Sequence, residues 1–551
     1  MASRSLLTLA PLVPAGGRRA EGTSEERTVN LKRLKRRRVV VSAGALIAAA
    51  MLSLGSTSAV ATTGGHSAVE HERLRVMTLN IFYGGDDLDL KTGDFCATPN
   101  GCPQTLVQIE RAVTQARADI VGVQEPERNV ERIASALGWY GSDRAHVMSR
   151  FPIIDPPGSN GLYVYVEVAP GRVVAVANTH LPSDPYGPYL VRDGGTVKQV
   201  LDLERKTRLP AVQDLVKVLP ALARKGIPVM LTGDFNSPSH LDWTPAVAAE
   251  RADVPYAVKW PASSALAAAG LRDTYREAHP DPVAVPGFTW TPGSPEADAH
   301  EVFDRIDWVL TSGPTRTIDS TVVGEKGGPD VGVGVSPWPT DHRGVVSTLD
   351  VVPAVPQVLV SPATRRVTIG KDLPVAFHAA GRQGERVELR DAKGRAVTSR
   401  PTKSGRTDGT VTLPTKGLRR GAYAVALVSR GKVVSKAPVW LYPAGEPTKV
   451  SVGKSSYKQG ESIKVDWSNA PGMGLDWVSV YACPGGKCQD TSEYLVYTYT
   501  GSAIEGQAKI GPKSIGADSS WPLPPGRYVV RLLPDDGVVS VAQSAMFTVT
   551  K

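Results

Sequence analysis

Polar side chains follow several apolar stretches in the first two thirds of the chain. In IPVMLTGDFNSP (227–238) an apolar run stops at a glycine, and Asp234 and Asn236 follow two positions apart. Residues two apart in a strand face the same way, so we expect both side chains to look into one site. An acid and an amide held together at one rigid edge form a candidate polar site.

Further polar residues occupy comparable positions at the ends of other expected strands: Asn80, Glu125, His180, Asp307, Asp341 and His342. If these strands share a sheet, their ends can converge at one edge. Taken singly, each residue has an ordinary explanation, because a strand-terminal Asn is often a turn residue and an Asp is often a surface charge. The prediction of a site therefore rests on the ordered set.

Residues 62–352 alternate strand-like and helix-like stretches, which predicts a layered α/β domain. Apolar residues at helical spacing mark helices over 103–118 and 208–226. A hairpin is expected over 162–181, around a Pro-Gly turn. Single strands are expected over 74–81, 119–125, 227–236, 305–312 and 344–352.

Helical periodicity disappears after Val352, where short alternating strands are separated by Gly, Pro and Asp turns. The stretch 419–443 has the same layout as 524–549, which indicates an internal repeat. We therefore expect two all-β, immunoglobulin-like sandwich modules, residues 353–445 and 446–551.

The N-terminus has the three parts of a signal peptide. A basic run over 32–38 precedes an apolar stretch over 39–54, and Ala59-Val60-Ala61 is a small-residue cleavage signal. We expect residues 1–61 to be removed and the mature protein to be secreted, either extracellular or associated with the cell surface. A retained anchor is the alternative. The sequence leaves open whether the general or the twin-arginine export route is used.

Charge is distributed unevenly along the chain. Of the formal net charge of +9, the leader 1–61 carries +7, residues 62–350 carry about −10, and residues 351–551 carry about +12. An acidic body is a poor tight binder of long nucleic acid. The basic tail either contacts an anionic polymer or a cell surface, or is simply soluble, and no obligate protein partner is evident.

The four cysteines form two close pairs, Cys96 with Cys102 and Cys483 with Cys488. An even count, local pairing and export favour two short-loop disulfides. A zinc site is the rival interpretation, but it needs nearby His or further Cys, which neither pair has.

The motifs, taken in order, resemble the endonuclease/exonuclease/phosphatase superfamily, which includes DNase I-like nucleases, bacterial sphingomyelinases and inositol-polyphosphate phosphatases. The resemblance spans about 275 residues and implies a four-layer α/β sandwich with two mixed sheets face to face. The matching pieces are TLNI (78–81), VGVQE (121–125), MSRFPI (148–153), NTHL (178–181), TGDFN (232–236), RIDWVL (305–310) and TDHRGV (340–345).

The resemblance also implies roles for single residues. Glu125 is similar to the principal Mg²⁺ ligand, Asn80 to a neighbour that holds metal or phosphate, and Asp341 to a second metal-side acid. His180 is similar to the histidine that contacts the phosphate and helps the leaving group. Asp234 and Asn236 resemble the pair that orients water and contacts phosphate.

His342 resembles the general base and Asp307 the carboxylate that orients a histidine, although the resemblance leaves open which histidine. Mg²⁺ suits such a site because it prefers oxygen ligands and keeps several waters, with Mn²⁺ or Ca²⁺ as alternatives. A histidine supplies a base with a pKa near working pH.

The substrate is less clearly indicated. Tyr186 and Tyr189 line a substrate pocket or pack their loop onto the body, and the glycine-rich stretch 324–339 is expected to be a mobile rim loop with Trp338 as a substrate wall. Arg150 contacts phosphate or serves its own strand.

Three functions are open at this point. The first is an exported Mg²⁺-dependent phosphoesterase for a small or lipid-linked phosphoester. The second is a secreted, non-specific DNA or RNA nuclease that scavenges phosphate. The third is a surface-binding multidomain protein, although a binding protein has no need for so complete a polar set.

Overall fold

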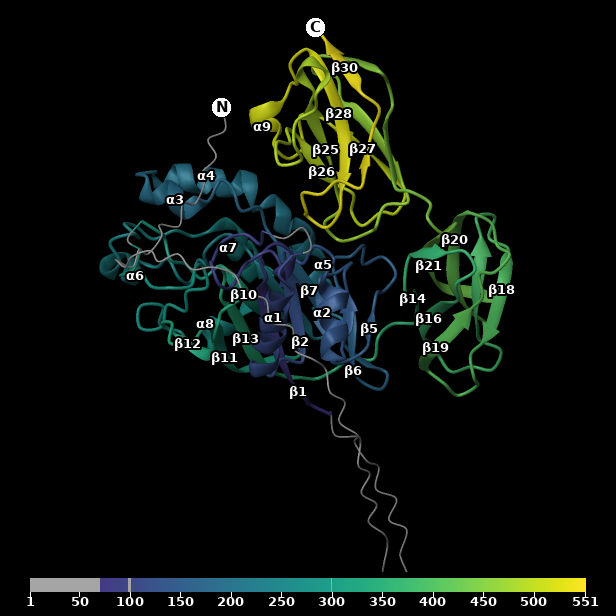
Figure 1. The fold of residues 1–551 in the computed structure, drawn as a ribbon. Coiled ribbons are helices and arrows are strands. Elements are labelled where there is room, and N and C mark those ends of the chain that lie inside the picture. The colour runs from purple at the N-terminus through teal and green to yellow at the C-terminus, as the bar shows by residue number, and fades with distance from the viewer. Residues whose placement is uncertain (1–69, 98–100, 299) are drawn as a thin grey trace, which may run out of the picture. The chain divides into compact units, whose positions relative to one another are not determined.

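The computed structural model describes residues 70–97, 101–298 and 300–551, all within one compact unit, Ser67–Lys551 (Figure 1). The expected signal peptide over 1–61 lies outside the described residues. Among the helices that are described, none has the length and apolarity needed to cross a membrane.

Two mixed sheets form the core of the N-terminal part. The first has the strand order β12-β11-β13-β1-β2-β4-β3, and the second has the order β5-β6-β7-β8-β10-β9. The strands of the first sheet are β1 (Glu72–Asn80), β2 (Ile120–Gln124), β3 (Tyr140–Ser142), β4 (Val147–Ser149), β11 (Thr315–Glu325), β12 (Val331–Val335) and β13 (Gly344–Val351). Those of the second are β5 (Ile153–Ile154), β6 (Val164–Ala169), β7 (Arg172–His180), β8 (Val229–Asp234), β9 (Arg272–Asp273) and β10 (Asp307–Ser312).

Helices cover the outer faces of both sheets. Helices α1 (Pro103–Gln115) and α2 (Val130–Leu137) bury residues such as Ile109 and Ile133 against β1 and β2. Helices α5 (Gln213–Ala223) and α7 (Pro261–Ala268) cover β7 and β8 in the same way. The remaining helical segments of this part are α3 (Gly187–Arg192), α4 (Val197–Thr207), α6 (Pro245–Glu250), α8 (Thr274–Ala278), η1 (Tyr83–Gly85) and η2 (Pro210–Val212).

A third apolar cluster fills the space between the sheets. It combines Val76 of β1 and Val345 of β13 with Val166 of β6 and Val176 of β7, all of them fully buried. Strands with apolar side chains on both faces can serve two such clusters at once. The result is a layer order of helix, sheet, sheet and helix, which confirms the predicted four-layer DNase I-like sandwich.

Two predictions about local structure are wrong in detail. The stretch 324–339 is expected to be a rim loop, but residues 331–335 of it form β12, which pairs with β11 at the sheet edge. The stretch around Tyr186 and Tyr189 was expected to be a loop, but α3 begins at Gly187. Pro188 stands in the first turn of this helix, where a missing N–H costs nothing.

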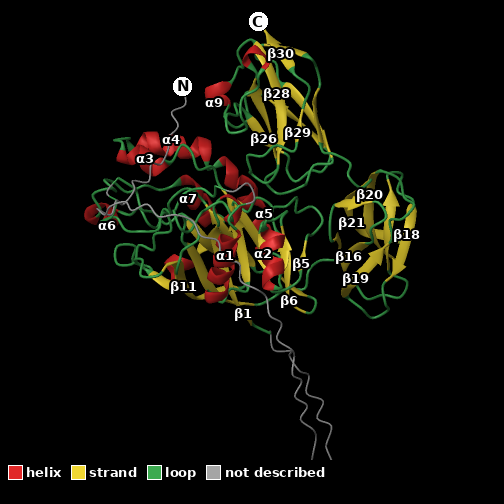
Figure 2. Cartoon of the chain, in the orientation of Figure 1, coloured by secondary structure: helices red, strands yellow, loops and turns green. Residues whose placement is uncertain are grey.

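Beyond β13 the regular secondary structure of the described chain is almost all strand, coloured yellow in Figure 2, and loops join the strands. The first module has sheets β14-β16-β19 and β15-β21-β20-β17-β18, and the second has β22-β24-β27 and β23-β30-β28-β25-β26, with β29 paired to β28. The two strand orders correspond position by position. This confirms β-sandwich modules built from an internal repeat.

The strands of the first module are β14 (Leu359–Pro362), β15 (Arg366–Thr368), β16 (Leu373–His378), β17 (Arg386–Asp391), β18 (Ala396–Pro401), β19 (Asp408–Leu413), β20 (Gly421–Ser429) and β21 (Lys432–Tyr442). Those of the second are β22 (Lys449–Val452), β23 (Ser456–Lys458), β24 (Ile463–Ser468), β25 (Trp477–Ala482), β26 (Tyr497–Tyr499), β27 (Gly506–Ile510), β28 (Gly526–Leu533), β29 (Ala542–Gln543) and β30 (Phe547–Thr550), with short helices η3 (Pro484–Gly486) and α9 (Ala517–Ser520).

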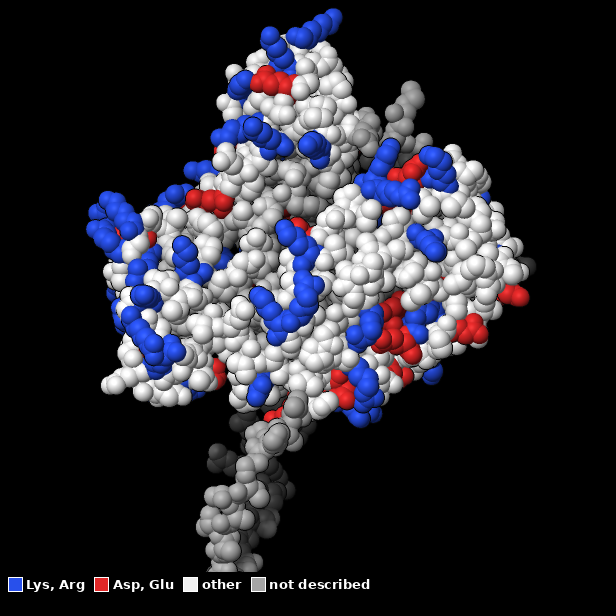
Figure 3. Space-filling view, turned by 180° about the vertical axis from the view of Figure 1, so that it is seen from behind, with Lys and Arg blue, Asp and Glu red and all other residues white. Residues whose placement is uncertain are grey.

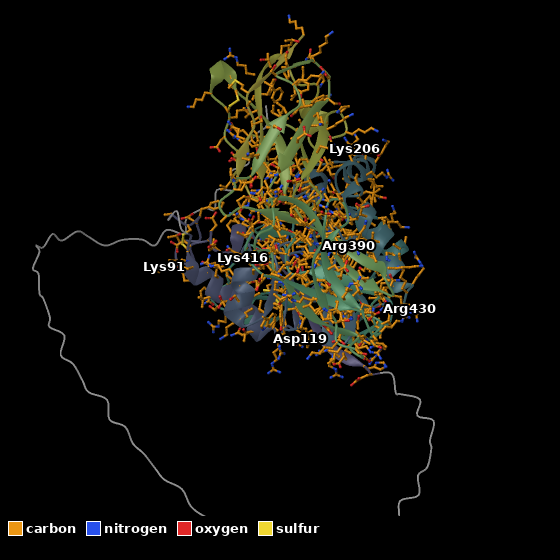
Figure 4. All side chains as sticks on the ribbon, turned by 90° about the vertical axis from the view of Figure 1, so that its right-hand side faces the viewer. Lys91, Asp119, Lys206, Arg390, Lys416 and Arg430 are labelled. Carbon is orange, nitrogen blue, oxygen red and sulfur yellow. A yellow bond between two sulfur atoms is a disulfide. The ribbon has the colours of Figure 1, made fainter. Side chains whose placement is uncertain are left out.

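One face of the molecule shows how its basic residues are distributed. Arg390, Lys416 and Arg430 of the first module are labelled in Figure 4, and on the face drawn in Figure 3 the Lys and Arg side chains stand in small groups between uncharged surface. A role of the modules in holding an anionic polymer stays a prediction.

Candidate active site

The pairing of the strands brings the predicted residues to one edge. Asn80, the last residue of β1, lies opposite Gln124 at the end of parallel β2, directly before Glu125. In the second sheet Asp234 lies opposite both His180 on β7 and Asp307 on β10. The carboxyl ends of parallel strands share an edge of the sheet. The site is therefore built from rigid strand ends.

A buried polar cluster ties the two sheets together beneath this edge. Gln124 Nε2 donates to Asn178 Oδ1 over 2.7 Å, and the Thr232 hydroxyl donates to the same oxygen over 2.8 Å. The close approach requires Gly122, because a Cβ there would lie 1.8 Å from Thr232 Oγ1. Residues of three motifs thus fix the distance between the two sheets. The sequence alone did not indicate this structural role.

Asp234 is the centre of the cluster of charges. It is 1% exposed, and its Oδ2 accepts from Asn80 Nδ2 at 3.1 Å. Asn80 Nδ2 also donates to Glu125 Oε1 at 3.0 Å, while Asn80 Oδ1 accepts from the backbone of Phe82. Asn80 thereby holds the two carboxylates side by side across the sheets. Its predicted direct contact with metal or phosphate stays a prediction.

The two histidines face the same carboxylate. His342 Nε2 lies 3.6 Å from Asp234 Oδ2, and His180 Nε2 lies 3.6 Å from that same oxygen. His180 Nε2 is also 3.8 Å from Glu125 Oε1. Both imidazoles therefore turn Nε2 toward the space where the strand ends converge.

The structure answers which histidine Asp307 supports. Its Oδ2 lies 3.0 Å from His342 Nδ1, and both side chains are buried. Burial lowers the pKa of His342, but the nearby carboxylates, above all Asp307 and Asp234, outweigh it and hold the pKa well above its usual value. Asp307 fixes the ring and leaves Nε2 free to face the site.

Neighbouring carboxylates also raise the pKa values of His180 and Asp341. Burial lowers the pKa of His180, yet the carboxylates around it, Asp536 first among them, raise it to about 9. Burial and the charge of Glu125 raise the pKa of Asp341 to about 6, although His342 opposes the shift. Carboxylates packed this closely favour a bound cation.

The donor set suits a hard metal ion. Asp234, Asp307 and His342 each offer one ligand atom, all within 4.8 Å of one another. Asp307 Oδ1 is buried and, among the described residues, has no hydrogen-bond partner. Oxygen-rich sets of this kind match Mg²⁺ better than soft metals. This set differs from the predicted ligands Glu125 and Asp341, whose assignment stays a prediction.

Asn236 does not lie on the strand as expected. β8 ends at Asp234, and Asn236 follows in a turn with a φ of 46°. Its backbone N–H donates to Asp234 Oδ1 over 2.9 Å, and its Nδ2 donates to the carbonyl of Leu181 over 3.0 Å. Asn236 therefore braces the Asp234 carboxylate from behind, and its contact with phosphate stays a prediction.

The prediction that Arg150 contacts phosphate is wrong. Its guanidinium lies 2.9 Å from Asp119, which precedes β2 and is labelled in Figure 4. The site lies at the other end of β2, after Gln124. β4 runs antiparallel to β2, so the residue that follows β4 reaches the edge away from the site. Arg150 is thus structural, which was the alternative.

For the aromatic residues near the site, the structure favours packing roles over substrate binding. The Tyr186 hydroxyl donates to Asp304 over 3.1 Å and the Tyr189 hydroxyl donates to Glu301 over 2.9 Å, so these two tyrosines pack α3 onto the body rather than line a substrate pocket. Trp338 donates from Nε1 to the carbonyl of His342 over 2.7 Å and packs against the core, so it holds the backbone of His342.

Trp290 was missed by sequence reasoning. Its ring centroid lies 4.9 Å from that of His342, and the two residues form an isolated β-bridge. Trp290 stands in a stretch rich in Gly and Pro without strand or helix periodicity, which gave no signal. It forms an apolar wall beside the imidazole.

Both predicted disulfides are present, Cys96–Cys102 and Cys483–Cys488, and no free cysteine remains in the described chain. The zinc alternative is thereby removed.

Known proteins match the N-terminal part of the chain. Residues 77–342 match the model of the Endonuclease/Exonuclease/phosphatase family. An uncharacterized protein of Caenorhabditis elegans is 28% identical over 265 residues, which cover 44% of this chain and 79% of that protein.

Two solved structures are also similar, each with a low TM-score. An endonuclease/exonuclease/phosphatase from Beutenbergia cavernae has 19% identity and a TM-score of 0.31, covering 67% of this chain and 100% of its own. An AP endonuclease from Archaeoglobus fulgidus has 15% identity and a TM-score of 0.31, covering 50% and 98%.

The family match covers the whole span that supplies the strand ends, from β1 to His342. Hydrolysis of a phosphoester bond is the chemistry that this family shares. Residues 77–342, just under half of the chain, therefore have the strand order and motifs of the endonuclease/exonuclease/phosphatase family.

Proposed function

We propose that this protein is a secreted, Mg²⁺-dependent hydrolase of small or lipid-linked phosphoesters. The observation that carries the proposal is the pair of histidines whose Nε2 atoms both face Asp234 Oδ2 at 3.6 Å, at the edge of two rigid sheets. Such a pair can act on opposite sides of one phosphate. The predicted leader and the two disulfides support export.

Glu125 and Asp341 would hold the metal, and Asn80 keeps Glu125 in place through its 3.0 Å hydrogen bond. When bound, Mg²⁺ supplies neutralisation of the negative charge on the phosphate. Asp234, Asp307 and His342 are a second set of possible donors, but a metal ion bound to His342 would occupy the nitrogen that the base needs, so we assign the metal to Glu125 and Asp341.

The side chains divide the remaining work. His342, fixed at Nδ1 by Asp307, takes a proton from water at Nε2 in its deprotonated form, which becomes populated as the pH approaches its raised pKa. Asp234 orients that water, because its carboxylate lies within 3.6 Å of the same nitrogen. His180 faces the site from the other side and donates a proton or hydrogen bond to the phosphate or the leaving oxygen.

The surroundings of the site favour a compact substrate. Burial and the nearby acids Asp87 and Glu125 raise the pKa of Glu127 to about 7. Two arginines of the matching motifs are engaged with acids, Arg150 with Asp119 and Arg343 with Glu325. Tight binding of a polynucleotide needs several phosphate contacts from Lys and Arg. A substrate with a single phosphoester group needs fewer such contacts than a polynucleotide.

The test is a metal-dependence screen of the purified mature chain. The substrates are a bis-aryl phosphodiester, sphingomyelin vesicles, inositol phosphates, DNA and RNA, each with chelator and with Mg²⁺ restored. We expect Mg²⁺-dependent turnover of a compact phosphoester. Turnover of DNA or RNA alone would establish the nuclease instead, and no turnover of any substrate would refute the proposal.

The variant His342→Ala tests whether this side chain serves catalysis rather than stability. We expect turnover to fall by about 10²–10⁴-fold while the thermal unfolding midpoint stays near that of the wild type. His300→Ala is the matched control, because His300 is exposed. Equal turnover in the two variants would remove His342 from the mechanism.

A further inference from the structure

A turn of the second sandwich module reaches the candidate active site. It follows β28 and comprises residues 534–537, closed by a 3.0 Å hydrogen bond from the N–H of Gly537 to the carbonyl of Pro534. Its central residues, Asp535 and Asp536, have φ values of 57° and 62°. Glycine adopts this conformation most easily, and aspartate tolerates it better than most residues.

Asp535 anchors the turn to the catalytic domain. Its carboxylate is hydrogen-bonded to the His146 ring, and its Oδ2 accepts from the backbone N–H of Arg128 over 2.7 Å. Asp535 is 1% exposed. Arg128 stands three residues after Glu125, so this contact fixes the turn to the loop that carries the predicted metal ligand.

A second contact lies beside the turn. Arg144 donates from one guanidinium nitrogen to the carbonyl oxygens of Gly472 and Ser502, over 3.1 and 2.9 Å. The Ser502 hydroxyl donates to the carbonyl of Asn160 over 3.1 Å. The turn is therefore part of a wider set of contacts and does not depend on a single pair.

Asp536 faces His180. Its Oδ2 lies 3.5 Å from His180 Nδ1, and its Oδ1 accepts from the Tyr499 hydroxyl over 3.1 Å. Its backbone N–H donates to the carbonyl of Leu475 over 3.0 Å. The second module thus holds the carboxylate from behind and leaves one oxygen for the imidazole.

The two histidines now have matching surroundings. His342 has Asp307 at Nδ1 and Asp234 at Nε2, whereas His180 has Asp536 at Nδ1 and Asp234 at Nε2. Asp307 comes from the catalytic sheet, 35 residues before His342. Asp536 comes from a different module, 356 residues after His180.

We infer that Asp536 is a positioning residue for His180, and that the second sandwich module completes the active site. A carboxylate at Nδ1 holds the ring so that Nε2 points at the reacting group. The inference rests on the proposed function, because it assigns His180 the role of contacting phosphate or leaving group. It makes the module part of the catalytic unit.

The test compares Asp536→Asn with the wild type on the phosphoester that the wild type hydrolyses. Asn keeps the shape and the bond to Tyr499 but removes the charge. We expect kcat to fall by about 10–100-fold with KM little changed. Asp536→Glu, which restores the carboxylate, should recover part of the loss.

The control is Arg430→Asn in the first module. Arg430 is exposed and has a φ of 50° in the turn that corresponds to residues 534–537. A merely structural role of Asp536 is separated by a double-mutant cycle with His180→Ala. If Asp536 acts through His180, its replacement has no further effect on kcat once the imidazole is gone.

Failure of the proposed function and failure of the inference about Asp536 give different results. A wild type without metal-dependent turnover refutes the proposed function. A wild type with normal turnover, combined with an Asp536→Asn variant as active as Arg430→Asn, overturns the inference alone. An equal loss of kcat in the presence and absence of His180 also overturns it, because Asp536 would then act on the fold rather than on His180.

Discussion

The two sandwich modules share one strand order and differ in a single turn that matters for the site. In the first module Arg430 and Gly431 connect β20 to β21. In the second, the corresponding positions are Asp535 and Asp536, and both side chains contact residues of the catalytic domain. The repeat supplies the same scaffold twice, and the chemistry of two side chains decides which copy joins the active site.

The difference extends to what stabilises each module. The second has the Cys483–Cys488 disulfide and a cluster of aromatic rings that includes Trp477, Tyr494 and Tyr497. The first has no cysteine. A module that must hold the carboxylate that positions His180 gains from such bracing, whereas a module without this task does not need it.

The largest expected effect comes from breaking the anchor of the second module. Asp535→Ala leaves the buried His146 without its partner, so the free energy of unfolding should fall by roughly 3–5 kcal/mol. Denaturant unfolding measures it, with Arg430→Ala as the corresponding change in the first module. Equal stability of the two variants would mean that the contact contributes nothing.

A smaller effect is expected from the disulfide that only the second module has. Replacing Cys483 and Cys488 together by Ala releases a short loop and should cost about 2 kcal/mol of stability. Thermal unfolding and a urea titration measure the loss of unfolding free energy. Because Cys483 follows Ala482, which pairs with Tyr528 at the end of β28 away from the 534–537 turn, kcat should change less than in Asp536→Asn. A larger change in kcat would contradict the assignment to the turn.

The smallest effect is expected from making the turns alike. Arg430→Asp with Gly431→Asp gives the first module the two aspartates of the second. Since Arg430 is exposed, we expect kcat/KM and the unfolding midpoint to stay within error of the wild type. A clear change in kcat/KM would show that the first module also serves the site.

Sequence reasoning found the residues whose positions follow from strand ends. Asn80, Glu125, His180, Asp234, Asp307 and His342 each stand at or next to the end of an apolar strand, and parallel and antiparallel pairing then forces them together. The layer order followed from alternating helix and strand periodicity for the same reason. Local pattern and strand pairing agree in this part of the chain.

The predictions that the structure corrects, and the residue that they omitted, have physical explanations. Asn236 was placed on β8 because a period of two was continued past the turn that begins after Asp234. Arg150 was assigned to the site without the direction of β4, which only the sheet reveals. The contact between Asp536 and His180 could not be predicted, because Asp-Asp-Gly is an ordinary hairpin-turn sequence. The histidine lies 356 residues earlier in the chain.

The central claim is that water attacks phosphorus at the edge shared by the two sheets. It is tested most directly by running the Mg²⁺-dependent reaction in ¹⁸O-labelled water and analysing both products by mass spectrometry. The account predicts one labelled oxygen in the phosphoryl product and none in the released alcohol, with the labelling abolished by chelator and strongly slowed in His342→Ala. Label in the alcohol, or labelled phosphate formed equally fast with chelator present, would contradict it.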